Sequence, residues 1–283
     1  MAKNDNKSVF SSGWTRRGLV AAAVVGAAAL STLSAPVLAG STWDGLKGDV
    51  FGQRRIENGL GIMTLKAPVR PEDQRAVPVD IEARFADGRT VKSVTLVVDE
   101  NPMPVSAVFN MGPNQRQVSL KTNIRLNQQT EVRAIVEASD GALYMASQLV
   151  KFAGGQAACA APPTGNPEEI AANMGKMQLT DASTSGQATQ IMHDMRLRIS
   201  HPNHTGMALD QQTLLYIPLR MISSLEVMQG DVKLFDMIGS ITLSENPVLE
   251  FPVSLTGEHT LNVVLKDSDG TEWKRSLPIQ AGS

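Results

Sequence analysis

The stretch Val77-Pro78-Val79-Asp80-Ile81-Glu82-Ala83-Arg84-Phe85 decides the fold class of this chain. Every second residue in it is apolar, and the residues between are polar except for one proline. Such a period of two predicts a β-strand with one buried face. The turn pair Asp87-Gly88 follows, and Val91–Asp99 forms a second strand-like run. Asp-Gly between two such runs predicts that they pair as a β-hairpin.

Further strand-like runs lie on both sides of a break in the middle of the chain, and turn pairs separate several of them. Short strands at this spacing predict an all-β chain made of two β-sandwiches, over residues 40–152 and 191–283. The runs are 105–111, 118–124, 131–138, 142–152, 195–200, 213–228, 232–236, 248–255, 260–266 and 271–279, with turns at Asp140-Gly141, Gln229-Gly230, Thr256-Gly257 and Asp269-Gly270.

Residues 153–190 form the break and are dominated by Gly, Ala, Pro, Asn, Ser and Thr. A long stretch of this composition is typical of a flexible linker between domains. Two short helices are expected in the chain. One is capped by Thr42, with Trp43 and Leu46 facing inward, and the other begins at Asn166-Pro167 and ends by Met177.

The N-terminal residues 1–39 have the pattern of an export signal. Arg16-Arg17 precedes the apolar run Leu19–Leu30, and small residues lead to Val37-Leu38-Ala39. This order predicts a twin-arginine signal peptide cleaved after Ala39 and a periplasmic protein. An uncleaved membrane anchor is the alternative.

The charge of the chain limits its partners. The leader holds four basic residues and one acidic residue, so its removal changes the formal net charge from −2 to −5. An acidic protein without basic clusters is not expected to bind nucleic acid, or a membrane after processing.

Cys159 is the single cysteine of the chain and follows two glycines within the break. It cannot form an internal disulfide, and an odd cysteine in an exported protein indicates an intermolecular bond or a reactive thiol. Glycine, alanine and proline neighbours predict that the thiol is exposed on a flexible arm. An incidental linker thiol is the other interpretation.

Several motifs before the break and at its start resemble SoxY, the thiol-bearing subunit of a sulfur-oxidation carrier. They are Val91–Pro104, Val132-Arg133-Ala134, Ser139-Asp140-Gly141, Leu143-Tyr144-Met145 and Gly154-Gly155. Motifs after the break resemble its partner subunit, SoxZ. They are His201-Pro202, Thr205-Gly206, Ser244-Glu245-Asn246-Pro247 and Asp267-Ser268-Asp269-Gly270.

The order of these motifs is similar to that of fused SoxYZ-like carriers that accompany quinoprotein dehydrogenases. The resemblance implies two immunoglobulin-like sandwiches, a sulfur-containing intermediate held on Cys159, and an arm that includes Gly154 and Gly155. It implies redox or sulfur-metabolising enzymes as partners, with a quinoprotein dehydrogenase system among them. SoxY carries its cysteine in a C-terminal Gly-Gly-Cys-Gly-Gly tail. Here Gln156-Ala157-Ala158 intervenes and the arm is internal, which puts thiosulfate-type cargo in question.

Two other function classes compete with the carrier. Met192-His193-Asp194-Met195 and His201-Pro202-Asn203-His204 offer imidazole and thioether ligands that suit copper, although no closed ligand set is visible. A passive scaffold, in which Cys159 is dispensable, is the third class. No histidine lies in a catalytic signature near the cysteine, so we expect no catalytic residue and no enzyme. We also expect no metal site, because no closed ligand set is visible, and no resident cofactor.

Overall fold

A computed structural model describes residues 42–280 of the 283-residue chain, except for residues 153, 155, 184–190 and 257. The predicted signal peptide, its cleavage site and Gly155 lie outside the described residues. Within the described part of the chain, no helix is long and apolar enough to span a membrane.

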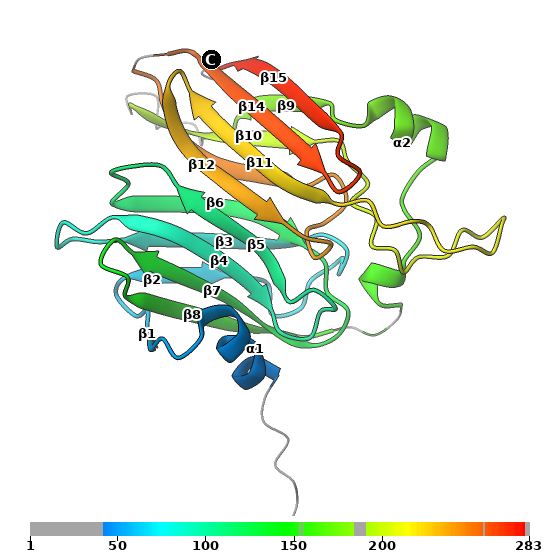
Figure 1. Cartoon of the computed structure of the whole chain (residues 1–283), viewed down its shortest axis with the longest axis horizontal. Coiled ribbons are helices and arrows are strands. Elements are labelled where there is room, and N and C mark those ends of the chain that lie inside the picture. The colour runs from blue at the N-terminus through cyan, green and yellow to red at the C-terminus, as the bar shows by residue number, and fades with distance from the viewer. Residues whose placement is uncertain (1–41, 153, 155, 184–190, 257, 281–283) are drawn as a thin grey trace, which may run out of the picture. The chain divides into compact units, whose positions relative to one another are not determined.

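Two β-sheets make up most of the described chain (Figure 1). The nine-stranded sheet has the order β1-β8-β7-β4-β5-β12-β11-β14-β15, and the six-stranded sheet has the order β2-β3-β6-β13-β10-β9. The strands are β1 Ile56–Asn58, β2 Met63–Lys66, β3 Val77–Arg84, β4 Val91–Val98, β5 Val105–Met111, β6 Gln117–Ile124, β7 Thr130–Ala138, β8 Leu143–Val150, β9 Met177–Asp181, β10 Met192–Ile199, β11 Ile222–Gln229, β12 Val232–Gly239, β13 Val248–Ser254, β14 Thr260–Asp267 and β15 Glu272–Pro278.

One apolar core lies between the two sheets and extends through both halves of the chain. It takes the inward-facing residues of β3, such as Val77 and Ile81, together with residues of β11 and β14, such as Leu225 and Val263. Because strands from both sheets contribute to this core, the sheets pack face to face as a sandwich. The predicted all-β fold class is confirmed.

The two halves of the chain share both sheets at a common junction. In the nine-stranded sheet β5 pairs with β12, from Phe235↔Met111 to Gly239↔Ala107, and in the six-stranded sheet β6 pairs with β13. The rings of Phe109 and Phe235 meet across this junction with centroids 5.9 Å apart. Continuous hydrogen bonding and a shared core therefore join the halves, in addition to the chain connection between them.

Gly112 follows β5 and lies where the backbones of the two halves approach closely. Its N–H donates to the carbonyl of Leu234 at 2.9 Å, and a side chain at this position would collide with the backbone carbonyl of Lys233. Only glycine lacks the Cβ that would cause this collision.

The predicted hairpin of β3 and β4 is wrong. β3 pairs with β2 and β6 in one sheet, whereas β4 pairs with β5 and β7 in the other. Asp87-Gly88 therefore carries the chain across the core. The local pattern is compatible with either arrangement, because two strands whose apolar faces meet across a core alternate in the same way as a paired hairpin.

Other local predictions agree with the structure. Asp140-Gly141, Gln229-Gly230 and Asp269-Gly270 connect the paired strands β7–β8, β11–β12 and β14–β15. Helix α1 (Thr42–Phe51) buries Trp43 against Ile135 and Leu143 of the nine-stranded sheet.

The segment predicted as a linker contains the helix predicted at Asn166-Pro167 and, in addition, a strand that was not predicted. Helix α2 (Pro167–Asn173) is capped by Asn166, whose side chain accepts from the N–H of Glu168 at 2.8 Å. Strand β9 (Met177–Asp181) then pairs with β10 and forms an edge of the six-stranded sheet. Residues 153, 155 and 184–190 of this segment lie outside the described part.

Candidate functional site

Cys159 lies in the short 3-10 helix η1 (Ala158–Ala160) and is 1% exposed. The prediction of a displayed thiol is therefore wrong for this structure. The neighbouring alanines that make the segment slim also make it apolar, so it packs against the protein instead of extending into water. A carrier role for this thiol requires the segment to leave its position. We call residues 154–165 the arm, of which all but Gly155 belong to the described residues.

Three hydrogen bonds to its backbone hold η1 at the junction of the two halves. The N–H of Cys159 donates to Oδ1 of Asn127 at 2.9 Å, and the N–H of Ala158 donates to the carbonyl of Leu126 at 3.3 Å. The hydroxyl of Thr205 donates to the carbonyl of Cys159. Asn127 follows β6 and Thr205 follows β10, so each half provides part of the binding surface for the arm.

Arg125 supplies a buried positive charge at this site and is 6% exposed. Its Nη1 donates to the carbonyls of Asn203 at 2.7 Å and Ile241 at 3.1 Å, and its Nη2 donates to that of Pro202 at 3.1 Å. Among the described residues, no carboxylate forms an ion pair with it. The guanidinium is therefore paired with backbone dipoles from the other half, and burial lowers its pKa.

The docked thiol is a weak nucleophile. Burial raises the pKa of Cys159, and the charge of Arg125 together with the side chain of Asn127 opposes this shift only in part. Since the thiolate is the reactive form, the docked state keeps Cys159 both protonated and out of reach.

The two ends of the arm have fewer contacts than η1. At the entry, Gln74 Nε2 donates to the carbonyl of Gly154 at 3.1 Å, and Gly154 has a φ of 93°, which favours glycine. At the exit, the N–H of Thr164 donates to a carboxylate oxygen of Glu245 at 3.1 Å, and Arg75 approaches the Thr164 hydroxyl at 3.4 Å. These are exposed contacts, which water readily replaces.

The sequence predicted Cys159 and Gly154 but not the groups that hold them. Arg125 and Asn127 lie just after a predicted strand, and nothing in their local pattern marks them as partners of a cysteine more than 30 positions away. Thr205 belongs to a SoxZ-like motif, yet that motif does not reveal its bond to Cys159.

The proposed copper ligands do not converge in the structure. His193, near the start of β10, bonds Oδ2 of Asp181 through Nδ1 at 2.8 Å, whereas His201 lies beyond the other end of the strand. In the described part of the chain, no three His, Cys, Asp or Glu side chains come together as a metal site would require.

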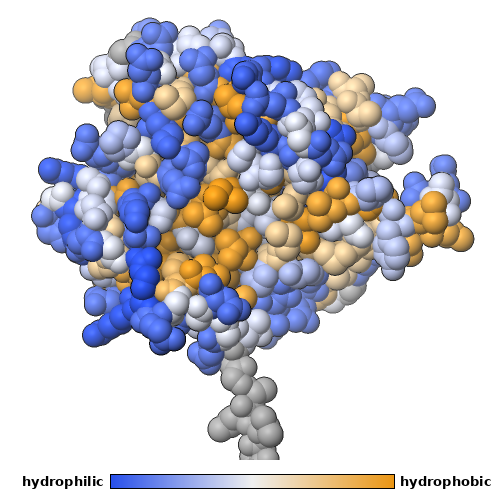
Figure 2. Space-filling view, in the orientation of Figure 1, coloured by the Kyte–Doolittle hydropathy of each residue, from blue (hydrophilic) through white to orange (hydrophobic). Residues whose placement is uncertain are grey.

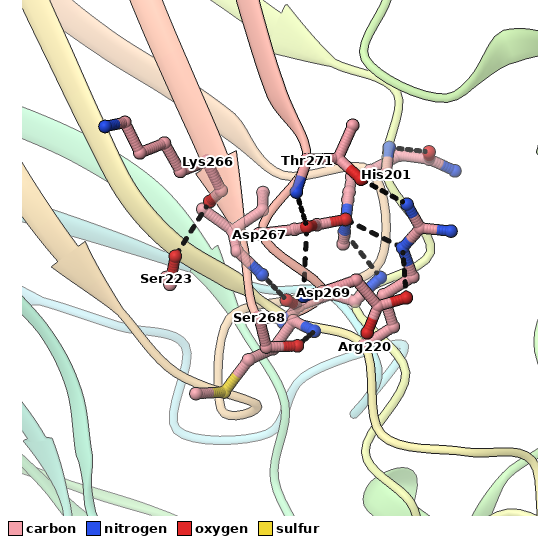
Figure 3. A network of polar contacts seen from close by, with 12 residues as sticks. His201, Arg220, Ser223, Lys266, Asp267, Ser268, Asp269 and Thr271 are labelled. Carbon is pink, nitrogen blue, oxygen red and sulfur yellow. Dashed lines mark hydrogen bonds and ion pairs between the residues drawn. The ribbon is translucent and has the colours of Figure 1, made fainter.

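His201 instead belongs to a partly buried polar network with Arg220, Asp267 and Thr271 (Figure 3). Asp267 accepts from Nε of Arg220 at 2.7 Å and from the N–H of Thr271 at 2.9 Å, and Nε2 of His201 lies 3.7 Å from it. Nδ1 of His201 accepts from the N–H of Asn203 at 3.0 Å. This network fixes the chain on either side of residues 204–220.

Family models match both halves of the chain. The model described as sulfur oxidation protein SoxY matches residues 47–157, and the model described as sulphur oxidation protein SoxZ matches residues 178–278. The chain is a fused SoxYZ-like carrier protein. Membership of the two families identifies the chain as a sulfur-oxidation carrier whose halves are immunoglobulin-like sandwiches. Carriers of this kind work with sulfur-metabolising enzymes. Cys159 lies two residues beyond the end of the SoxY match.

The solved structure of the sulfur carrier protein SoxY from Chlorobium limicola f thiosulfatophilum is also similar, at 25% identity. The similarity covers 40% of this SoxYZ-like chain and 92% of that protein, with a TM-score of 0.32. Comparison with curated proteins finds no match.

Proposed function

We propose that this SoxYZ-like protein is an exported, periplasmic carrier that holds a sulfur-containing intermediate covalently on Cys159. The observation that carries this proposal is the position of the thiol on a short segment bound across the junction of both halves. In this proposal the carrier has two states, a docked arm with a protected thiol and an undocked arm that enters a partner enzyme.

The docked state suits a thiol that must survive in an oxidising compartment. A solvent-exposed thiolate there is open to oxidation and to disulfide formation. With Cys159 1% exposed and its pKa raised, the reactive form arises only when the arm is released. Release breaks the three hydrogen bonds of η1 and returns the thiol to water, where its ionisation is no longer penalised by burial.

Loading follows from ordinary thiol–disulfide chemistry. The thiolate of the undocked arm attacks the sulfane sulfur of a donor that contains an S–S bond. The new S–S bond to Cys159 forms as the donor bond breaks, and the departing thiolate takes the electron pair and a proton from solvent. No external oxidant is needed, because the oxidation level of the donor passes to the carrier.

The burial of Cys159 also favours a second candidate, the passive scaffold for a quinoprotein dehydrogenase. A scaffold does not need the arm to undock, and its thiol has no cargo. The two candidates differ in whether Cys159 carries mass in the cell.

Intact mass spectrometry on protein purified from its native compartment tests the proposal. We expect an adduct on the wild type that reductant removes, and no adduct on Cys159→Ser. An unmodified wild type, together with normal physiological function of Cys159→Ser, would favour the scaffold. The mass of the mature protein from the same experiment tests cleavage after Ala39.

A further inference from the structure

Residues 204–220 form a projecting hairpin, which we call the tongue, beside the docked arm (Figure 1, yellow). Its two sides pair through the bridges His204↔Arg220 and Leu209↔Tyr216. The sequence predicted a strand from 213 onward, but regular pairing in the sheet begins only at Ile222. The tongue is therefore a separate element that leaves the sandwich and returns to it.

The tip of the tongue presents apolar side chains to water. Leu214, Leu215 and Tyr216 are 74%, 69% and 66% exposed. Three consecutive exposed apolar residues are uncommon on a protein surface unless they bind something. Figure 2 shows apolar colour at the edge of the molecule where the tongue projects.

The tip is held in one conformation rather than left loose. The carboxylate of Asp210 accepts from the N–H groups of Gln212 at 2.9 Å and Thr213 at 2.8 Å. The N–H of Leu214 donates to the carbonyl of Asp210 at 2.9 Å, and Leu214 has a φ of 57°, which is rare for leucine. Backbone strain of this kind persists where the surroundings enforce it, and it is concentrated at functional sites. A preorganised tip loses little entropy when a partner binds it.

The base of the tongue contacts the arm directly. Thr205 donates to the carbonyl of Cys159, and Ala208 lines the same small cavity as Ala158, Ala161 and Pro163. The tip lies roughly 20 Å from this base, given the rise of a strand per residue. A standard interface covers about 800 Å² on each partner, a patch roughly 30 Å across, so it would include both the tip and the arm.

We propose that the tongue is the docking element for the enzyme that loads Cys159, and that this enzyme receives the tip in an uncharged apolar pocket beside the entrance of its active site. The pocket is apolar because the three exposed side chains of the tip, Leu214, Leu215 and Tyr216, are uncharged. The inference rests on the carrier function, since a partner that grips the tip is placed over the arm that holds the thiol.

The test uses the full chain expressed in its native host, with the fraction of Cys159 that carries an adduct measured by intact mass. In the triple variant Leu214→Ser, Leu215→Ser, Tyr216→Ser we expect this fraction to fall at least tenfold. The matched control is Val232→Ser with Ile238→Ser, which removes two apolar residues of the same half that are 57% and 55% exposed. The control is expected to load as the wild type does.

Each other outcome overturns a defined part of the inference. Equal loading of wild type and triple variant removes the docking role but leaves the carrier function intact. If the fraction of loaded Cys159 falls equally in the triple variant and the control, the loss is not specific to the tongue and the docking role is removed. A wild type that is never loaded removes the carrier function, and the docking proposal with it. The thiol-reagent rate of the purified triple variant must match the wild type, because a faster rate would mean that the substitutions had released the arm.

A photo-crosslinking amino acid at position 215 identifies what occupies the tip. We expect it to capture one enzyme, and removal of that enzyme from the host should leave Cys159 without its adduct. Capture of a second copy of the chain would make the tip a self-association surface and overturn the proposal.

Discussion

The hydroxyl of Thr205 donates a hydrogen bond to the carbonyl of Cys159, 46 residues earlier in the chain and outside the half to which Thr205 belongs. The C-terminal half thus closes the site of the thiol, while Asn127 of the N-terminal half holds the N–H of the same residue. Release of the arm must break both contacts. The rate at which Cys159 reacts with a reagent therefore measures how often they break.

Weakening either contact is expected to accelerate the reaction of Cys159 with a thiol reagent. A hydrogen bond contributes about 1 kcal/mol, so Asn127→Ala and Thr205→Val should each raise the rate roughly fivefold to tenfold. Wild-type Cys159 should react far more slowly than in the unfolded protein. Thr205→Ser keeps the hydroxyl and should remain close to the wild type.

Gln128→Ala is the control for Asn127. Its side chain bonds Glu100 at 3.1 Å on the surface, although it lies next to Asn127 in the sequence. An unchanged rate in Asn127→Ala and Thr205→Val would mean that the arm opens by a route that leaves these bonds intact.

Arg125 is expected to contribute strongly to stability. Arg125→Met leaves the carbonyls of Pro202, Asn203 and Ile241 buried without their donor. Buried unsatisfied polar groups cost about 1–3 kcal/mol each, so we expect a loss of roughly 3 kcal/mol or more in the free energy of unfolding, measured by urea denaturation. Lys92→Met removes a cation that is 65% exposed and should change stability by less than about half a kcal/mol. Similar stabilities of the two variants would contradict the role assigned to Arg125.

The junction is expected to hold the halves together without the chain connection. A protease site inserted at Gly165 separates the N-terminal half from β9 and the rest of the C-terminal half. Because β5–β12 and β6–β13 continue both sheets, the cleaved protein should elute from a sizing column at micromolar concentration as one species. Gly112→Ala introduces a collision with the backbone of Lys233 and should weaken this association. Free halves after cleavage of the otherwise unaltered chain would contradict the shared core.

Local patterns predicted much of this fold because they report burial. Alternation identified β3, turn pairs identified three hairpins, and Asn166-Pro167 identified the start of α2. They could not predict which sheet β4 joins, since pairing depends on residues distant in the chain. An exposed thiol was predicted only from the flexible Gly, Ala and Pro residues around Cys159. An alanine-rich segment can instead pack against a complementary surface, and here Asn127 and Thr205 contribute to that surface.

The site is difficult to predict for the same reason. Cys159 was identified because it is the one cysteine, and Gly154 because glycine pairs signal an arm. Arg125 has no such signal, since a lone arginine after a strand is usually an exposed residue. The structure alone reveals that its guanidinium crosses the junction.

Acid is expected to destabilise the protein through His201. Burial lowers the pKa of this imidazole to about 4, against a partial opposing effect of Asp267. The unfolded chain takes up a proton near pH 6.5, so between about pH 6.5 and 4 it binds more protons than the folded protein, and stability falls as the pH falls. At pH 4 or below, this effect lowers the free energy of unfolding by about 3 kcal/mol relative to its value above pH 6.5.

In His201→Asn a short amide replaces the imidazole, and its oxygen is a candidate acceptor for the N–H of Asn203. This variant should lose part of its stability at pH 7 but show a much weaker fall between pH 6.5 and 4, measured by urea denaturation across that range. Ser223→Ala, beside the same network, removes no titratable group and should follow the wild-type pH dependence (Figure 3). If His201→Asn loses stability on acidification as steeply as the wild type, the proton taken up on unfolding belongs to another residue.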